Sequence, residues 1–154
     1  MNKRAGLLLA GALIGVLAAG PLQGWSQAST GPATIRITDL EIAVSRVDVG
    51  ARGTSPGDVE VVRSRLRERV TQNTIGRSEL VCTFVDRVRS RVCRGTYILP
   101  KGKIVVGGSI LYSQFYDLAV VGGTGLYDNA RGTLTVTQTS RKPVRNLVLF
   151  RLVG

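Results

Sequence analysis

The feature that most constrains this chain is a pair of strand-like runs separated by glycines. The first run, 118–121, is short, apolar and β-branched, which is typical of a buried strand. The second run, 133–139, alternates threonines with Leu134 and Val136, so it is expected to form a strand with one face buried. The glycines between them permit positive φ or a close backbone approach, and they predict a sharp turn at Gly122, Gly123 and Gly125.

A glycine cluster after a strand also invites a phosphate-binding hypothesis. The spacing does not support it, because Asp128 occupies the place where a dinucleotide-binding fingerprint has its third glycine. No helix is expected after the cluster to offer its N-terminus to a phosphate, and no Gly-Lys-Ser/Thr follows. A structural turn is therefore the preferred interpretation.

The first 28 residues resemble a secretory leader. A basic start (2–4) is followed by an apolar stretch (5–20), and Ser26 and Ala28 supply small side chains where a signal peptidase acts. The alternative is an uncleaved membrane anchor, but the stretch is shorter than the ~18–20 residues that a membrane span needs. We expect a cleaved signal peptide, 1–28, and one domain, 29–154, that is secreted, or periplasmic if the source has an outer membrane.

The composition excludes several classes of function. The chain contains no histidine, which excludes serine–histidine and cysteine–histidine hydrolases and argues against a zinc site. Loss of Lys3 and Arg4 with the leader lowers the net charge from +11 to +9. The positive residues are scattered without interleaved aromatics and no nucleic-acid-binding motif is present, so we expect a solvated basic surface and no nucleic acid partner. Association with an anionic cell envelope is the alternative use of this charge.

Turn signals divide the remaining chain into further strands. A glycine-rich loop, 50–57, follows the first of them, and Pro100–Gly102 and Ser140–Lys142 are predicted to be tight turns. One segment, 58–69, is ambiguous, because its apolar residues fit a helical stripe while its arginines alternate as they would in a strand. The unambiguous strands are expected at 34–48, 74–86, 91–99, 103–112, 116–121, 132–139 and 143–153.

Two stretches resemble a known family. Ala119–Gly125, followed by Tyr127 and Ala130-Arg131-Gly132, is similar to the signature of dirigent proteins and allene oxide cyclase barrel-like proteins, and Cys93–Ile104 is similar to the strand, turn and strand before it in bacterial members. The resemblance extends from about Gly76 to the C-terminus. It implies that 58–69 is a strand with its arginines facing water.

Eight antiparallel strands at short spacing predict an all-β fold, an eight-stranded antiparallel β-barrel. The resemblance implies that this barrel is of the allene oxide cyclase-like, calycin-like kind. A two-sheet sandwich is the alternative. The resemblance further implies self-association as a homotrimer.

The two cysteines, Cys82 and Cys93, lie on strands that the segment 86–91 joins. In an antiparallel hairpin centred on that segment they face each other or lie within a two-residue step, so we expect a disulfide between them, which export favours. The alternative, a free catalytic Cys82, comes from the resemblance, because plant allene oxide cyclases carry a cysteine at the start of this strand. It is disfavoured since no histidine can activate the thiol.

The resemblance also nominates site residues. Asp117 matches an aspartate of several dirigent proteins and is the candidate catalytic acid, and Arg131 of the Ala-Arg-Gly motif is the second candidate. Their structural alternatives are an exposed carboxylate at a strand end and a supporting ion pair. An ungapped match puts Gly50 where plant allene oxide cyclases carry a catalytic glutamate, which argues against that activity. The candidate ligand-binding residues are the aromatics Phe84, Tyr97, Tyr112, Phe115, Tyr116 and Tyr127, each of which could equally be ordinary core.

The functional hypothesis is a secreted dirigent-like barrel. It binds a small hydrophobic or aromatic molecule and steers its coupling or cyclisation by shape and exclusion of water, with no cofactor and no metal. If it is an enzyme, it is a cyclase, an isomerase or a stereo-directing protein. A non-catalytic, lipocalin-style binding barrel and a basic structural protein of the cell envelope are the alternatives.

Overall fold

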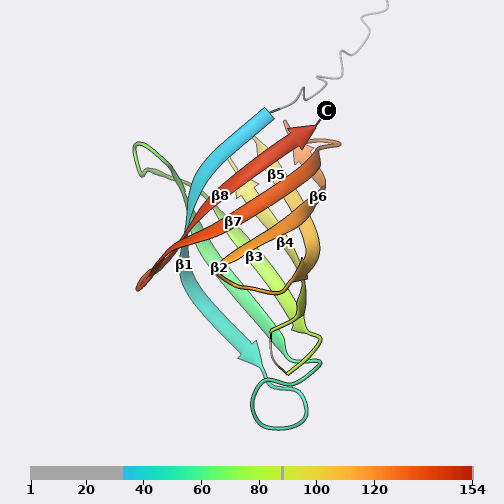
Figure 1. The fold of residues 1–154 in the computed structure, drawn as a ribbon. Helices are drawn as coiled ribbons and strands as arrows, with labels where there is room; N and C mark the ends of the chain where they lie inside the picture. The colour runs from blue at the N-terminus through green and yellow to red at the C-terminus, as the bar shows by residue number, and fades with distance from the viewer. Residues whose placement is uncertain (1–32, 88, 154) are drawn as a thin grey trace, which may run out of the picture.

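The computed structural model describes residues 33–87 and 89–153, so the expected leader lies outside the described residues. Within these ranges no helix is long and apolar enough to cross a membrane. The described chain is built from strands, and Figure 1 shows their arrangement. Their bounds are β1 Ala33–Val47, β2 Val59–Glu68, β3 Thr74–Phe84, β4 Arg91–Leu99, β5 Gly102–Ile110, β6 Phe115–Gly125, β7 Arg131–Arg141 and β8 Val144–Val153.

The strands form one closed antiparallel barrel in chain order. Each strand pairs with the next, and β8 returns to pair with β1 from Ala33 opposite Leu152 to Leu40 opposite Arg145. The end of β8 therefore lies beside the start of β1, as Figure 1 shows. The prediction of an all-β, eight-stranded antiparallel barrel is confirmed, and closure excludes the sandwich.

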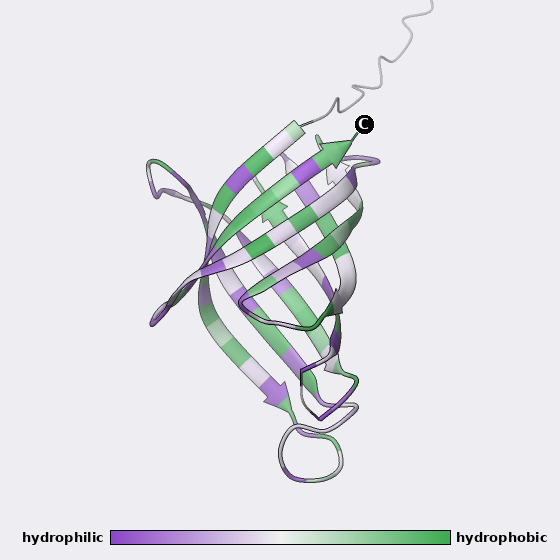
Figure 2. Cartoon of the chain, in the orientation of Figure 1, coloured by the Kyte–Doolittle hydropathy of each residue, from purple (hydrophilic) through white to green (hydrophobic). Residues whose placement is uncertain are grey.

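The ambiguous segment is a strand, β2. Ser64 and Leu66 are buried in the barrel, whereas Arg63 and Arg65 are exposed on its outer face. The same alternation of apolar and polar residues runs along the other strands in Figure 2. Since side chains alternate between the two faces of a strand, the arginines reach water while their neighbours fill the interior.

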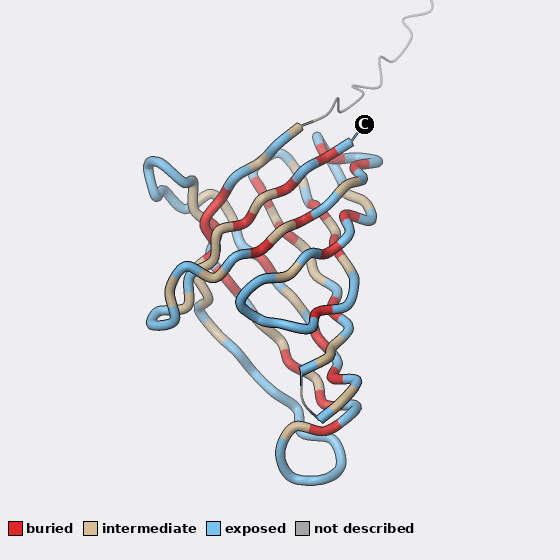
Figure 3. Tube along the Cα trace, viewed as in Figure 1, coloured by how far each residue is buried: buried red, intermediate tan, exposed pale blue. Residues whose placement is uncertain are grey.

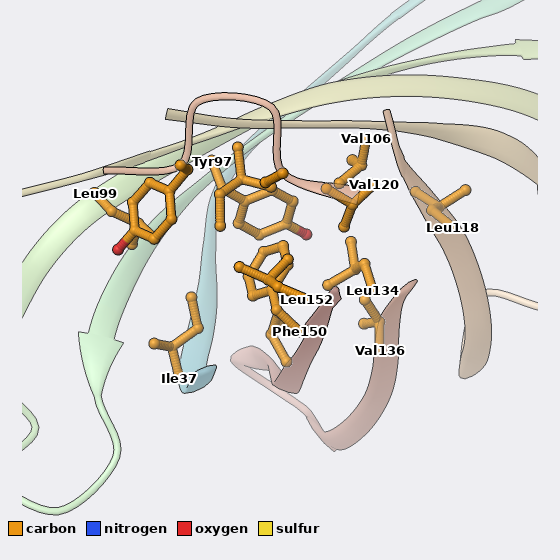
Figure 4. Packing of buried hydrophobic residues seen from close by; sticks show 14 of the residues in the cluster. Ile37, Tyr97, Leu99, Val106, Leu118, Val120, Leu134, Val136, Phe150 and Leu152 are labelled. Atoms are coloured by element: carbon orange, nitrogen blue, oxygen red, sulfur yellow. The ribbon is translucent and has the colours of Figure 1, made fainter. Parts of the chain in front are cut away.

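Apolar side chains fill the half of the barrel nearest the chain ends. Leu66, Ile104, Leu134, Val148 and Phe150 are completely inaccessible to solvent. Figure 3 shows buried positions alternating with exposed ones along the strands, and Figure 4 shows core side chains from different strands converging on one another. At the inner limit of this core the rings of Tyr97 and Phe150 meet edge to face, with centroids 5.1 Å apart.

The glycine cluster does not form the predicted turn. β6 continues through Gly125, and the turn follows at 126–129. Val105 pairs with Gly122 and Val106 with Val120, so the strand has an irregularity beside Val121. A Cβ on Gly123 would lie 2.2 Å from the Tyr127 carbonyl oxygen and 2.6 Å from that of Lys103. Glycine is therefore needed at this position for a close backbone approach, which is one of the two roles that the sequence predicted for the cluster.

The two tight turns differ in how well they were predicted. Pro100 and Lys101 form a two-residue link before Gly102, as expected. The link between β7 and β8 is Lys142-Pro143, later than predicted, because Ser140 still pairs with Arg145. Pro143 thus lies in the turn and does not begin the last strand.

The disulfide prediction is confirmed. Cys82 on β3 faces Cys93 on β4, and their Cα atoms lie 4.0 Å apart. The two residues are 11 positions apart in the sequence, and both are buried. The bridge fastens the β3–β4 hairpin beside the interior.

Reduction of this bridge should lower the free energy of unfolding by about 2–3 kcal/mol, because the open chain gains the entropy that the short loop loses on closure. Chemical denaturation with and without a phosphine reductant measures this difference. The double variant Cys82→Ala/Cys93→Ala is the control and should not respond to reductant. An equal loss in that variant would contradict the assignment of the effect to the bridge.

Gly123→Ala should destabilise the barrel by about 1–3 kcal/mol or more, because the new methyl group meets two backbone oxygens that cannot move aside. Gly122→Ala is the matched control, since the nearest atom to its Cβ is Arg131 Nη1 at 3.7 Å. Thermal denaturation compares the two variants. Equal stability would show that the close approach at Gly123 is not needed.

Candidate functional site

The other half of the barrel encloses a cavity of about 600 Å³. It opens at the end opposite the described chain ends, where loop residues stand around the mouth. Every strand contributes to its wall or floor. The lining side chains are Asp39, Glu41, Val44, Arg46, Thr54, Glu60, Val62, Ser64, Ser78, Leu80, Cys82, Phe84, Arg89, Arg91, Tyr97, Ile110, Leu111, Tyr112, Ser113, Gln114, Tyr116, Gln138, Val144 and Asn146.

The cavity exists because the inward face changes from apolar to polar along several strands at the same level. On β1 the change runs from Ile37 to Asp39, and on β7 from Val136 to Gln138. On β8 it runs from Val148 to Asn146. A break in the β1 register between Glu41 and Ala43 then turns even-numbered residues of that strand inward. Polar groups thus line this end, whereas apolar side chains pack the other half.

Asp39 is the most deeply placed acidic group of the cavity, with 4% of its surface exposed. Ser78 Oγ donates a hydrogen bond to Asp39 Oδ2 at 2.9 Å, and Asn146 Nδ2 donates one to Oδ1 at 3.4 Å. Burial raises the pKa of Asp39, although hydrogen bonds from Ser64, Ser78 and Asn146 oppose this shift. The Asp39 carboxyl group therefore takes up a proton at a higher pH than an exposed aspartate does.

Two tyrosines lie at the floor beside this carboxyl group. Burial, and then the negative charge of Asp39, raise the pKa of Tyr116 well above its ordinary value. The pKa of Tyr97 is raised too, first by burial and then by the charges of Tyr116 and Asp39. Both phenols are therefore neutral at physiological pH and able to donate hydrogen bonds.

An ion cluster forms the wall nearer the mouth. Arg46 Nη2 lies 2.6 Å from Glu60 Oε2, and Arg91 Nη1 lies 2.6 Å from Glu60 Oε1. Both guanidinium groups also stack over the Phe84 ring, at 5.1 and 5.6 Å from its centroid. The cluster links β1, β2, β3 and β4.

A buried carboxylate shapes the loop at the mouth. The Val49 amide donates to Asp58 Oδ1 at 2.8 Å, and the Ser55 amide donates to Oδ2 at 2.8 Å. The Ser55 hydroxyl adds a bond of 3.0 Å to Oδ1. These bonds lower the pKa of Asp58, and the bond from Val49 has the largest effect. Asp58 therefore stays ionised and fixes the loop that places Thr54 at the cavity.

The structure brings four of the six candidate aromatics to the cavity. Tyr97 and Tyr116 lie at its floor, while Phe84 and Tyr112 lie toward its mouth. Phe115 is exposed and lies outside the lining, and Tyr127 packs in the apolar core at the far end.

The two candidate catalytic residues lie outside the cavity. Asp117 is exposed on the outer face of β6, because Tyr116 and Leu118 on either side of it face inward. Arg131 is exposed at the start of β7, where its Nη1 donates to the Ala130 carbonyl at 2.9 Å. A catalytic role for either stays a prediction to which the cavity adds no support.

Sequence reasoning missed the polar groups that do line the cavity. Asp39, Glu41, Glu60 and the two arginines of the ion cluster all lie in the N-terminal half or at the start of β4. The available signal was a charged residue at an inward position of a strand. Using it requires the register of the strands, including the irregularity in β1.

The cavity wall offers proton donors and acceptors, and cationic groups. Within residues 33–87 and 89–153, no group of three or more histidine, cysteine, aspartate or glutamate side chains is arranged to hold a metal ion. Such a site can bind a small molecule, orient it against aromatic rings and donate hydrogen bonds to its oxygen atoms.

No protein-family model matches the sequence, and no curated protein does. Solved structures do match the fold. A pyocyanin demethylase superposes with a TM-score of 0.69 at 22% identity, covering 79% of this chain and 100% of that chain. A nonspecific heme-binding cyclase of neoabyssomicin biosynthesis, which catalyses a cycloaddition, gives 0.63 at 16% identity. That match covers 79% of this chain, which spans 65% of the cyclase.

Dirigent proteins are also among the similar structures. A pterocarpan synthase dirigent protein gives a TM-score of 0.61 at 14% identity, covering 79% of this chain and 82% of that chain. The structures agree with the resemblance seen in the sequence. This protein has the closed-barrel fold that dirigent proteins and cycloaddition-catalysing cyclases share.

Proposed function

We propose that the protein binds a small aromatic molecule in the open half of the barrel and steers its cyclisation or coupling. The observation that carries this proposal is the cavity of about 600 Å³, which lies within the range of known ligand sites. A barrel that served only as a structural element could fill this half with apolar side chains, as it fills the other.

The wall supplies both kinds of contact that such a ligand needs. Tyr112, which is half exposed, offers aromatic surface on which a ring can pack, and the buried rings of Tyr97 and Phe84 line the cavity. Asp39 and Tyr116 offer hydrogen-bond donors at the floor when they carry their protons. Because apolar side chains close the far end, water can enter only by the mouth, and the ligand displaces it.

Cyclisation and coupling fit these groups. A cycloaddition exchanges no atoms with the protein, so holding the reacting ends together supplies much of the rate. A hydrogen bond from protonated Asp39 to a ligand carbonyl oxygen would draw electrons from the reacting bond and increase the rate further. In radical coupling, a separate one-electron oxidant generates the radicals, and the cavity selects which faces meet.

The names of similar structures support the same direction. One similar structure is a cyclase that catalyses a cycloaddition, and another is a pterocarpan synthase dirigent protein. The disulfide supports export, because oxidising compartments preserve such bonds. Cleavage after Ala28, trimer formation and attachment to an anionic envelope stay predictions.

Blocking the cavity should abolish ligand binding. In Val62→Trp an indole fills space at the wall of β2, whereas in Val61→Trp it projects from the outer face of the same strand. We expect the neutral dye N-phenyl-1-naphthylamine to fluoresce with the wild type and with Val61→Trp but not with Val62→Trp. Equal fluorescence with both variants would place the dye elsewhere and contradict the proposal.

Steering is measured by the stereochemistry of products. The protein is mixed with aryl dienes and enone partners, or with phenols and a chemical one-electron oxidant, and the products are resolved by chiral chromatography. We expect an enantiomeric excess with the wild type and with Val61→Trp that Val62→Trp abolishes. Racemic products throughout, with dye binding intact, would overturn steering and leave a binding barrel.

The raised pKa of Asp39 gives a pH dependence of stability. The folded state favours the protonated carboxyl, so the stabilisation is complete below the unfolded-state pKa near 3.8 and is lost as the pH rises through the folded-state value. Asp39→Asn stays neutral throughout. The unfolding free energy of Asp39→Asn minus that of the wild type should therefore increase as the pH rises from 3.5 to 7. Denaturant titrations that give parallel pH profiles would contradict the raised pKa.

A further inference from the structure

We infer that the ligand carries an anionic oxygen group, such as a carboxylate or a sulfonate, that binds Arg46 and Arg91 near the mouth of the cavity. The inference rests on the proposed function and names the class of molecule that the cavity takes. It starts from the ion cluster around Glu60, which contains more hydrogen-bond donors and more positive charge than Glu60 can use.

The donors of the cluster exceed its acceptors. The two oxygens of Glu60 each accept one bond, one from Arg46 and one from Arg91, as described above. A guanidinium group has five N–H donors. Each group therefore has N–H donors that Glu60 does not engage, and both arginines line the cavity, with 46% of the Arg46 side chain and 15% of the Arg91 side chain exposed. A ligand oxygen that accepted a hydrogen bond from one of these groups would gain a charge-assisted contact.

The charge of the wall points to the same group. Two guanidinium groups face one carboxylate, which leaves an excess of one positive charge. Arg89 adds a third cation at the rim, 5.7 Å from the centroid of the Tyr112 ring. The other acidic side chains of the cavity are Asp39 and Glu41, and burial, the largest cause, raises the pKa of both, so each is protonated more readily than an exposed carboxyl group.

The cluster is held in place before a ligand arrives. Phe84 packs against both guanidinium groups, and Glu60 fixes one end of each. A role as a cross-link between strands accounts for the bonds to Glu60. It does not account for the placement of a third arginine, Arg89, at the rim of the same cavity. An anionic oxygen group beside the aromatic surface of Phe84 accounts for all of these features.

Two dyes that differ by one group test the inference. N-phenyl-1-naphthylamine is neutral, and 1-anilinonaphthalene-8-sulfonate has the same rings with a sulfonate added. We expect the wild type to bind the sulfonate dye at least about tenfold more tightly at low salt. Added potassium chloride should reduce this preference, because screening weakens the charged contact and leaves the neutral dye unaffected.

Three variants assign the preference to the cluster. Arg91→Met should lower the affinity for the sulfonate dye about tenfold or more relative to that for the neutral dye, and Arg91→Lys should retain part of the preference for the sulfonate dye. Glu60→Gln should raise the affinity for the sulfonate dye, because the competing carboxylate is removed. Arg63→Met on the outer face makes the same change in net charge and should alter neither affinity.

The outcomes separate this inference from the proposed function. If neither dye binds in the cavity, the proposed function fails. If the neutral dye binds and the sulfonate dye is not preferred, or if Arg91→Met and Arg63→Met affect it equally, only the inference is overturned. A loss of both dyes with Arg91→Met, alongside an unchanged circular dichroism spectrum, would also overturn it, because Arg91 would then support the cavity as a whole.

Discussion

The pairing of β1 with β8 is the interaction on which the rest of the structure depends. It closes the sheet, leaves no free edge and creates a single interior. From then on, each residue of a strand faces either that interior or solvent. The sequence of the inward positions therefore decides what the barrel contains, and here it contains an apolar core at one end and a polar cavity at the other.

The division of the interior explains why the polar groups can lie inside. Asp39 keeps hydrogen bonds from Ser78 and Asn146, and Glu60 is matched by two arginines. Buried polar groups are tolerated when they have such partners. The core below them fixes the strands in register, and Tyr97 belongs to both halves, since it packs on Phe150 and also forms part of the cavity floor.

Much of the fold could be predicted from sequence, because it depends on local patterns. The alternation around Leu134 and Val136 and the facing cysteines each specify a strand and its faces. The arginine row of β2 left helix and strand open, and the family resemblance decided between them. The role of the glycine cluster could be predicted only in part. Whether Gly123 serves a turn or a close approach depends on the carbonyl groups of Lys103 and Tyr127, which the fold brings to it.

The site was harder to predict for a physical reason. A resemblance in the C-terminal half directed attention to Asp117 and Arg131, but alternation along β6 turns Asp117 outward. The charged groups of the cavity come mainly from β1 and β2, where the irregularity near Ile42 changes which residues face inward. A shift of one residue exchanges the two faces of a strand, so these positions become clear only once the strands are paired.

The measurement that tests the account most directly is a crystal structure of the protein soaked with N-phenyl-1-naphthylamine. The account predicts density for the dye inside the open half of the barrel, against Tyr97 and within reach of Asp39. A cavity filled by its own side chains, with the dye bound on the outer surface or absent, would contradict the claim that this barrel is built around a ligand.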